Sequence, residues 1–384
     1  MLRPSTRWAP SQEPGIVWPE PWAYSGRVVK ASQLERSRER LLRLCQAELD
    51  VDELRLELVA ELKRAIGFAF WCWPLVDPVS LIPACALSEH EAMLAVFGRY
   101  MTLMECGPED INGYQTLARS RSAVGLLHQA TAGDPQRSVR GRELYLPLGL
   151  RDELRAVLRD GRGCWGYLNL QREVGDAPFD PEVGAFIAEL VPAFAAALRR
   201  SLHRGTSTAP AESPPGVLIL DNQLRLRAQT ASAKHWLQAM APAASPSSSP
   251  RVPPAVSAVA ARLLGQEAGV DPQRTARLRQ RLGSRGWVVV HAARLEGEGT
   301  GIAVTIEQAR AREVLDLLCQ AWGLSPREQA LLELVIAGHD TGQIARQLCI
   351  SPHTVQDHLK AIFDKVGVHS RRELVGGLVA IGEG

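Results

Sequence analysis

Near its C-terminus the chain repeats hydrophobic positions with the period of an α-helix, in three successive segments. In each segment the apolar side chains recur three or four positions apart, which places them on one face of a helix. The segments begin with the helix-capping residues Ser325, Asp340 and Ser351, and a proline follows each serine. The apolar stripes consist of Leu331, Leu332 and Val335, of Ile344, Ala345 and Leu348, and of Val355, Leu359, Ile362, Phe363 and Val366. This pattern predicts three capped helices in a row.

The third of these helices has a polar face opposite its apolar stripe. That face carries His353, Gln356, Asp357, Lys360 and Asp364. A short helix with long polar side chains on its free face can enter the major groove and reach base edges. Only a few residues separate the second helix from the third, as in a helix-turn-helix. The segment therefore predicts binding to double-stranded DNA.

This segment closely resembles the LuxR-type (GerE-type) DNA-binding domain over about sixty residues. The matching stretches are LSPRE at 324–328, IARQL at 344–348, ISP at 350–352 and KVGV at 365–368. The resemblance implies an all-α, four-helix domain in which the helix from Pro352 reads DNA. It also implies that a fourth helix, from about Ser370, forms a dimer contact through Leu374, Val375 and Leu378.

Individual contacts to DNA follow from positions on the recognition helix. Gln356 and Asp357 are expected to reach base edges, and Lys360 to meet a guanine or a phosphate. Other residues are expected to fix the register on the backbone. The complete predicted DNA-binding set is Ser351, His353, Thr354, Gln356, Asp357, Lys360, Lys365 and Arg371. A homodimer would place two such helices about one turn of DNA apart, on a pseudo-palindromic site.

Charge supplies the main objection to DNA binding. From Leu318 to the C-terminus there are six basic and seven acidic residues, a net charge of −1. DNA-binding domains usually present a basic surface, so a dimerisation module without DNA affinity remains an alternative. Cys349 also stands where these domains usually have glycine, and Gln356 replaces the usual lysine. Lys360, Lys365 and Arg371 lie on or just after the recognition helix, which favours DNA binding.

The remaining part of the chain is long enough for two further domains. A chain of 384 residues typically folds as two to four domains. The stretches GTSTAPAESPP (205–215) and APAASPSSSPRVPP (241–254) have the composition of a linker and of a loop. No run of eighteen apolar residues and no apolar signal-peptide core occurs, so we expect a cytoplasmic protein without a membrane span.

The first of these domains is predicted to be α+β. The pattern favours a helix over 31–65, strands over 67–73 and 81–87, and a helix from 88 towards 104. Asp160-Gly161 predicts a hairpin between strands 153–158 and 164–170, and a helix follows over 181–202. The order of elements, and the segment DGRGCWGYLNLQREVGDAPFDPEVGAFIAELVPAFAAAL, resemble a GAF domain.

The second of these domains resembles a PAS fold. A strand pair (216–221 and 224–228) leads to a helix with Trp236, a second helix (255–264) and strands near 277–282, 287–294 and 302–307. The predicted organisation is a multidomain chain with an arm (1–29), a GAF-like domain (30–203), a linker (204–215), a PAS-like domain (216–308), a connecting helix (309–322) and the helix-turn-helix domain (323–384).

The sequence lacks the common catalytic and cofactor-binding motifs. There is no Gly-Lys dipeptide and hence no P-loop, no GxSxG elbow, and His90-Glu91 lacks the second histidine of HExxH. Seven cysteines occur without a CxxC pair, and in a reducing compartment we expect them to be small buried hydrophobes. We therefore predict no metal site, no cofactor and no enzymatic activity.

Aromatic side chains are concentrated in the GAF-like domain. The candidates for the wall of an effector pocket are Phe70, Trp71, Trp73, Trp165 and Tyr167. Ordinary hydrophobic core is the alternative for them. The resulting hypothesis is a bacterial DNA-binding transcriptional regulator, a homodimer controlled by a small-molecule effector. Two alternatives remain open, namely control by a partner protein, and an enzyme within the GAF-like domain.

Overall fold

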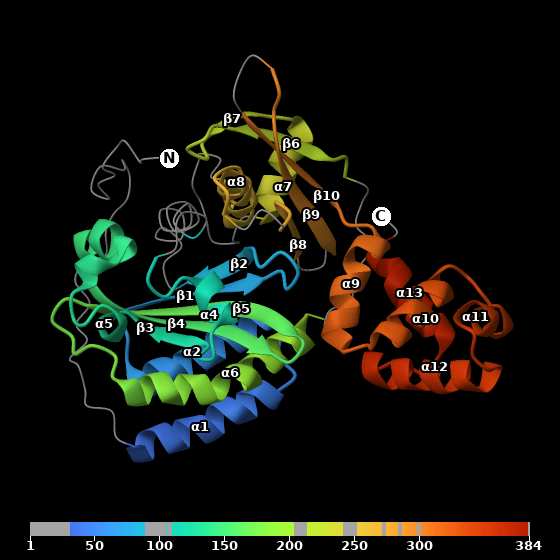
Figure 1. Ribbon diagram of the computed structural model, residues 1–384, viewed down its shortest axis with the longest axis horizontal. Helices are drawn as coiled ribbons and strands as arrows, with labels where there is room; N and C mark the ends of the chain where they lie inside the picture. The colour runs from blue at the N-terminus through green and yellow to red at the C-terminus, as the bar shows by residue number, and fades with distance from the viewer. Residues whose placement is uncertain are drawn as a thin grey trace. The chain divides into compact units, whose positions relative to one another are not determined.

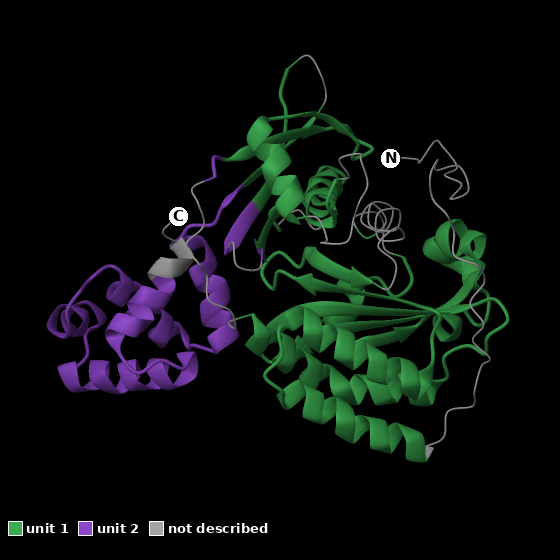
Figure 2. Cartoon of the chain, turned by 180° about the vertical axis from the view of Figure 1, so that it is seen from behind, with its two compact units in different colours: residues 1–204, 215–280, 290–306 green, residues 205–214, 281–289, 307–384 purple. Residues whose placement is uncertain are grey.

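The computed structural model describes residues 31–88, 105, 110–202, 213–240, 252–270, 274–282, 286–297 and 301–382 (Figure 1). Contacts divide the chain into two compact units (Figure 2). The larger unit comprises residues 1–204, 215–280 and 290–306, and the smaller unit comprises residues 205–214, 281–289 and 307–384.

The first sheet of the larger unit has five strands in the order β2-β1-β5-β4-β3. All neighbouring strands run antiparallel. The strands are β1 (Phe70–Val76), β2 (Pro83–Ser88), β3 (Val124–Leu126), β4 (Leu150–Asp160) and β5 (Gly163–Glu173). The predicted hairpin at Asp160-Gly161 is confirmed. The Asp160 carboxylate accepts the backbone N–H groups of Arg162 and Gly163 at 2.9 and 3.1 Å, which fixes the turn.

Helices cover one face of this sheet, as Figure 1 shows. Helices α2 (Val51–Ile66) and α6 (Pro181–Ser201) lie on this face, and α1 (Ala31–Gln46) packs on both of them. Among the described helices α6 alone is long and apolar enough to cross a membrane. Its apolar stripe, which includes Phe186, Leu190, Phe194 and Leu198, is nevertheless buried, and α6 packs on β3, β4 and β5. We therefore describe α6 as the core helix of this domain.

The predicted single helix over 31–65 is two helices. Asp50 adopts an extended conformation and accepts the N–H of Asp52, so it caps α2 and separates it from α1. The opposite sheet face carries short elements that the pattern missed, namely α4 (Tyr114–Arg119), α5 (Leu127–Ala130) and 3-10 and π turns over Pro135–Arg137, Gly141–Tyr145 and Leu146–Leu148. These segments are too short for a periodic signal. The helix expected from 88 towards 104 lies outside the described residues.

The second sheet also has five strands, in the order β7-β6-β10-β9-β8. Its strands are β6 (Gly216–Leu220), β7 (Leu226–Gln229), β8 (Arg277–Arg281), β9 (Trp287–Arg294) and β10 (Ile302–Gln308), with helices α7 (Ala231–Met240) and α8 (Pro254–Glu267). Counted along the chain, both sheets place their strands in the same order, 2-1-5-4-3. The strand predictions for this region lie within a few residues of the observed bounds.

The smaller unit contains the C-terminal helices. They are α9 (Ala311–Trp322), α10 (Pro326–Ile336), α11 (Thr341–Leu348), α12 (Pro352–Val366) and α13 (Arg371–Gly382). The three capped helices are confirmed, because Ser325 and Asp340 form capping boxes with Glu328 and Gln343, and Ser351 accepts the N–H of Thr354. The predicted stripes form the core, in which Leu331, Leu332, Val335, Ile344, Val355, Leu359 and Ile362 are buried.

Candidate functional site

The turn between α11 and α12 is the first element of the candidate DNA-binding site. Cys349 ends α11 in the left-handed conformation, with φ 53° and ψ 47°, and its N–H reaches the carbonyl groups of Ala345 and Arg346. Glycine adopts this conformation without the strain that a Cβ atom introduces, which explains why glycine is usual at this position. The structure therefore forms the helix-turn-helix turn despite the cysteine.

The polar face of α12 is open to solvent. His353 and Asp357 have side chains that are 85% and 69% exposed, and their Nδ1 and Oδ2 atoms lie 3.4 Å apart. Gln356 and Lys360 are also exposed, and Gln356 Nε2 lies 3.3 Å from the Thr341 hydroxyl of α11. The opposite side of α12 is buried through Val355, Leu359 and Ile362. This arrangement leaves long polar side chains free to contact a ligand as large as DNA.

Lys365, expected at the DNA backbone, instead forms an ion pair inside the domain. Its Nζ atom lies 2.7 and 2.6 Å from the two carboxylate oxygens of Glu328. Glu328 is 4% exposed and also accepts the N–H of Ser325 in the capping box. Hydrogen bonds from Lys365 and Ser325 hold the pKa of the Glu328 carboxyl below its usual value, against the effect of burial. Lys365 therefore joins the end of α12 to the start of α10.

Arg371 also holds the domain together. Its Nη2 group donates to the backbone carbonyl groups of His339 and Val335, at the C-terminal end of α10. Carbonyl groups in the last turn of a helix lack partners within the helix, so a guanidinium group there satisfies them. We infer that Lys365 and Arg371, placed in the DNA-contact set from the sequence, act mainly in positioning α12 and α13.

The leucines expected at a dimer contact are part of the monomer core. Leu374 and Leu378 are 1% and 2% exposed, whereas Val375 is half-buried. Helix α13 packs on α9, α10 and α12 within the same unit. A side chain already buried in its own domain offers no surface to a second copy, so Leu374 and Leu378 are corrected from dimer contacts to core residues.

Replacing Leu378 by aspartate should therefore unfold the C-terminal domain. A carboxylate without a partner in an apolar core costs several kcal/mol, so we expect a fall of about 3 kcal/mol or more in unfolding free energy. Chemical denaturation followed by circular dichroism measures this. A matched Gly377→Asp variant, at an exposed position of the same helix, should change stability far less. A stable Leu378→Asp protein that only loses its dimer would support the sequence-based assignment.

The five candidate effector residues of the GAF-like region do not lie on one face of the sheet. Trp73 packs against Phe194 of α6, with ring centroids 5.7 Å apart. The β4–β5 register shifts between Leu158 and Arg159, beside Trp165. Trp165 Nε1 donates to Asp160, which also accepts Arg199 of α6.

The strand register places the other aromatics. Trp71 is paired with Leu170, on the side of the sheet that faces α6, whereas Phe70 is paired with Gln171 on the other side. Tyr167 stacks on Tyr114 of α4, with centroids 4.0 Å apart. The tryptophans thus belong to the core beneath α6, and Phe70 and Tyr167 to the opposite face.

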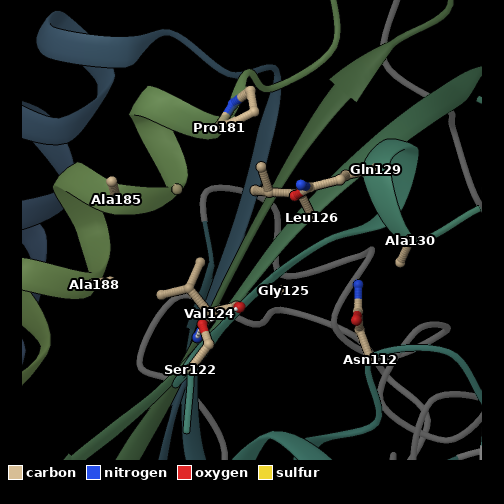
Figure 3. Close-up of a pocket in the computed structure, with 11 residues that line it drawn as sticks. Asn112, Ser122, Val124, Gly125, Leu126, Gln129, Ala130, Pro181, Ala185 and Ala188 are labelled. Carbon is tan, nitrogen blue, oxygen red and sulfur yellow. Dashed lines mark hydrogen bonds between the residues drawn. The ribbon is translucent and has the colours of Figure 1, made fainter. Parts of the chain in front are cut away.

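A hollow of about 400 Å³ lies where β3, α5 and the start of α6 meet (Figure 3). Its lining is uncharged and includes Asn112, Ser122, Gln129 and Ala185. A Cβ atom at Gly125 would lie 2.6 Å from the side chain of Asn112, so a larger residue there would have to displace that side chain. None of the aromatic residues proposed for an effector pocket lines this hollow.

A buried polar cluster on the sheet face opposite α6 was not anticipated from the sequence. At its centre the Glu153 carboxylate accepts Arg155 Nε and Asn169 Nδ2 at 2.7 Å, Arg140 Nη2 at 2.9 Å, and the Tyr145 hydroxyl. The two guanidinium groups lower the pKa of Glu153 to about 2, although burial acts in the opposite direction.

Arg155 extends this cluster towards α4. Its Nη1 lies 2.5 Å from Glu105 Oε1, and its guanidinium carbon lies 4.3 Å from the ring centroid of Tyr114. The polar strand positions Glu153, Arg155, Asn169 and Gln171 share one face in the hairpin, which is the only sequence signal that pointed to this cluster. Within the described part of the chain, no group of His, Cys, Asp and Glu side chains is suited to a metal ion.

These features of the C-terminal unit define a helix-turn-helix domain with an exposed polar recognition helix. Residues 323–376 match the family model of bacterial regulatory proteins of the luxR family. The spore germination protein GerE of Bacillus subtilis is 37% identical over 60 residues, which are 16% of this chain and 81% of that protein. The chain belongs to the LuxR family of bacterial regulatory proteins.

Similarity beyond this domain is limited. An HTH-type transcriptional regulator of Mycobacterium tuberculosis is 32% identical over 129 residues, and the chain spans 14% of that relative's length and matches it over 30% of its own. The crystal structure of Escherichia coli SdiA aligns over 90% of this chain and 97% of that one, at 11% identity and a TM-score of 0.34. A Vibrio cholerae VqmA–ligand–DNA complex aligns over 44% of this chain and 85% of that one, at 17% identity and a TM-score of 0.20.

Proposed function

We propose that this protein is a cytoplasmic, sequence-specific transcriptional regulator that binds double-stranded DNA through α12 and responds to an effector at its N-terminal domains. The observation that carries the proposal is the solvent-exposed polar face of α12 in a domain of the LuxR family. A homodimer on a pseudo-palindromic site is part of the proposal, since one short helix makes few phosphate contacts.

The sensory part of the proposal rests on the two sheets. Their common strand order supports the resemblance of the first to a GAF domain and of the second to a PAS domain. An uncharged hollow and a buried polar cluster in the first domain support a small-molecule effector. A partner protein as the effector is the second candidate, which the edge position of β3 in its sheet supports, because an edge strand can pair with another chain.

Replacing Gln356 by alanine should change which DNA sequences are preferred. A glutamine that contacts adenine contributes about 1–3 kcal/mol of discrimination against the wrong base. We expect selection from a randomised DNA library to show relaxed preference at one position of each half-site. Fluorescence anisotropy on matched operators then measures the individual affinities.

Lys360→Ala is the matched variant for Gln356→Ala. Both residues are exposed on the same helix. A lysine at a phosphate lowers the affinity for all sequences alike and reduces the slope of affinity against salt by about one unit. Equal, sequence-independent losses in both variants would show that Gln356 does not read bases. No DNA binding by the unmodified protein would favour the dimerisation module.

A further inference from the structure

Gln356, on the polar face of α12, has a hydrogen-bond partner on the neighbouring helix. Its Nε2 group donates to the hydroxyl oxygen of Thr341, the first residue of α11, at 3.3 Å. The two residues are 15 positions apart, so the helix-turn-helix fold brings them together. By contrast, the contact between His353 Nδ1 and Asp357 Oδ2 on the same face lies within α12 itself. Gln356 is therefore tied to a different helix from the one that carries it.

Thr341 is held in place at the start of α11. The capping box fixes the backbone there, because Asp340 accepts the N–H of Gln343 at 2.8 Å and the Gln343 side chain accepts the N–H of Asp340 at 2.8 Å. The following turn is anchored by the buried residues Ile344 and Ala345. Threonine is branched at Cβ, which restricts its side-chain torsion. The Thr341 hydroxyl group is thus a fixed point for a flexible glutamine.

The hydrogen bond decides which groups of the Gln356 amide remain for DNA. A primary amide has two N–H donors and one carbonyl oxygen. One N–H is used on Thr341, so one N–H and the oxygen remain side by side. In the major groove adenine presents an acceptor, N7, and a donor, the N6 amino group. Guanine presents two acceptors, N7 and O6, which require two donors. The tied amide therefore matches adenine and not guanine.

The contact with Thr341 also prepares Gln356 for binding. Ordering a free glutamine side chain on a base costs rotamer entropy, because its torsions become fixed. Gln356 is exposed at its own helix, whereas Thr341 is half-buried and offers the hydroxyl from the side. A side chain that is already ordered in the unbound protein loses less freedom when it meets DNA. The hydroxyl group thus contributes to both the choice of base and the affinity for it.

We propose that Thr341 is a positioning residue that determines specificity, because it orients Gln356 so that the protein selects adenine over guanine at one base pair of each half-site. Thr341 acts through Gln356 and needs no contact of its own with DNA. The inference rests on the proposed reading of bases by Gln356. It adds which base is selected and which residue outside the recognition helix sets the choice.

The test begins with selection from a randomised DNA library by the full-length protein, which identifies the base pair that responds to Gln356→Ala. Fluorescence anisotropy then gives the ratio of affinities for adenine and guanine at that base pair. Thr341→Val removes the hydroxyl group and keeps the shape, so the adenine preference should fall about fivefold, the effect of one hydrogen bond. Thr341→Ser retains the hydroxyl group and should keep the preference within about twofold.

Two controls separate positioning from a general loss of binding. In the Gln356→Ala background, Thr341→Val should have no further effect on the ratio, because Thr341 acts through Gln356. Gln347→Ala changes an exposed polar residue of the same helix α11 and should leave the ratio unchanged. Each ratio compares two DNA duplexes with one protein sample, so partial unfolding of a variant does not alter it.

An adenine preference that survives in Thr341→Val would overturn the inference, and a change of preference in Gln356→Ala alone would leave the regulator function intact. Equal losses for all DNA sequences in Thr341→Val would assign Thr341 to the phosphate backbone or to folding instead. A preference of the unmodified protein for guanine would show that the amide is turned the other way, with the hydroxyl group donating to its oxygen. Absence of sequence-specific binding by the unmodified protein would refute the regulator function and this inference together.

Discussion

Replacing Glu153 by glutamine is expected to lower the unfolding free energy of the first domain by about 3–5 kcal/mol, because it leaves two buried guanidinium groups without their shared carboxylate. Glu153 accepts donors from four side chains, and Arg140, Arg155 and Glu153 are all at most 1% exposed. Glutamine has a similar shape but presents only one acceptor oxygen, and its amide group faces the N–H groups of the arginines.

The pH dependence of stability provides a second measurement for Glu153. Its pKa is lowered from 4.5 to about 2 in the folded protein. The stabilisation by the ionised carboxylate is therefore fully present above about pH 5 and is lost as the pH falls towards 2. We expect chemical denaturation at several pH values to show this loss in the unmodified protein and a weaker dependence in Glu153→Gln.

Glu57→Gln is the control for Glu153→Gln, because Glu57 is an exposed residue of α2. It should change stability by no more than about 0.5 kcal/mol. If Glu153→Gln were equally neutral, the buried cluster would contribute little to folding.

Replacing Lys365 by methionine should lower the unfolding free energy of the C-terminal domain by about 1–3 kcal/mol, since it leaves the buried Glu328 carboxylate without its cation. The pKa of Glu328 is lowered in the folded domain, so the stabilisation by its ionised form is present above its unfolded pKa and is lost in acid. In the variant this pKa should rise. Denaturation at neutral and at mildly acidic pH measures both effects.

A double-mutant cycle separates the ion pair from a direct role of Lys365 in DNA binding. Glu328→Gln combined with Lys365→Met should destabilise the domain by less than the two single losses together. Lys360→Met, at an exposed position of the same helix, should preserve stability and weaken DNA binding. If Lys365→Met instead keeps full stability and reduces the salt dependence of DNA binding, then Lys365 contacts a phosphate, as the sequence suggested.

The helices of the C-terminal domain could be predicted from the sequence because their determinants are local. Ser325, Asp340 and Ser351 cap helices within three residues of themselves, and the apolar stripes need only the helical period. The hairpin at Asp160-Gly161 was predictable for the same reason. Such patterns also identify which face of α12 remains exposed, since a side chain opposite a buried stripe must face outwards.

The partners of charged side chains depend on the tertiary structure. From the sequence, Lys365 is expected to be a free basic residue at the recognition helix. In the structure the carboxylate of Glu328, 37 positions earlier in the chain, lies against its ammonium group. From the sequence, Leu378 belongs to an apolar stripe that was expected to be exposed on a terminal helix. In the structure α9, α10 and α12 surround α13, and Leu378 is buried. An apolar stripe on a helix indicates that another element covers it. The sequence does not show whether that element belongs to the same chain or to a second copy of it.

The sequence by itself determined the class of protein, a helix-turn-helix regulator, and most of its helices and strands, because these depend on contacts between near neighbours. The tertiary structure alone decided which residues meet in the first domain. The register shift beside Trp165 separates it from Tyr167, although strict alternation would place both on one face. The polar cluster joins Glu105, Arg140 and Glu153 from separate segments, since burial of charge requires partners that only chain folding brings within hydrogen-bonding distance.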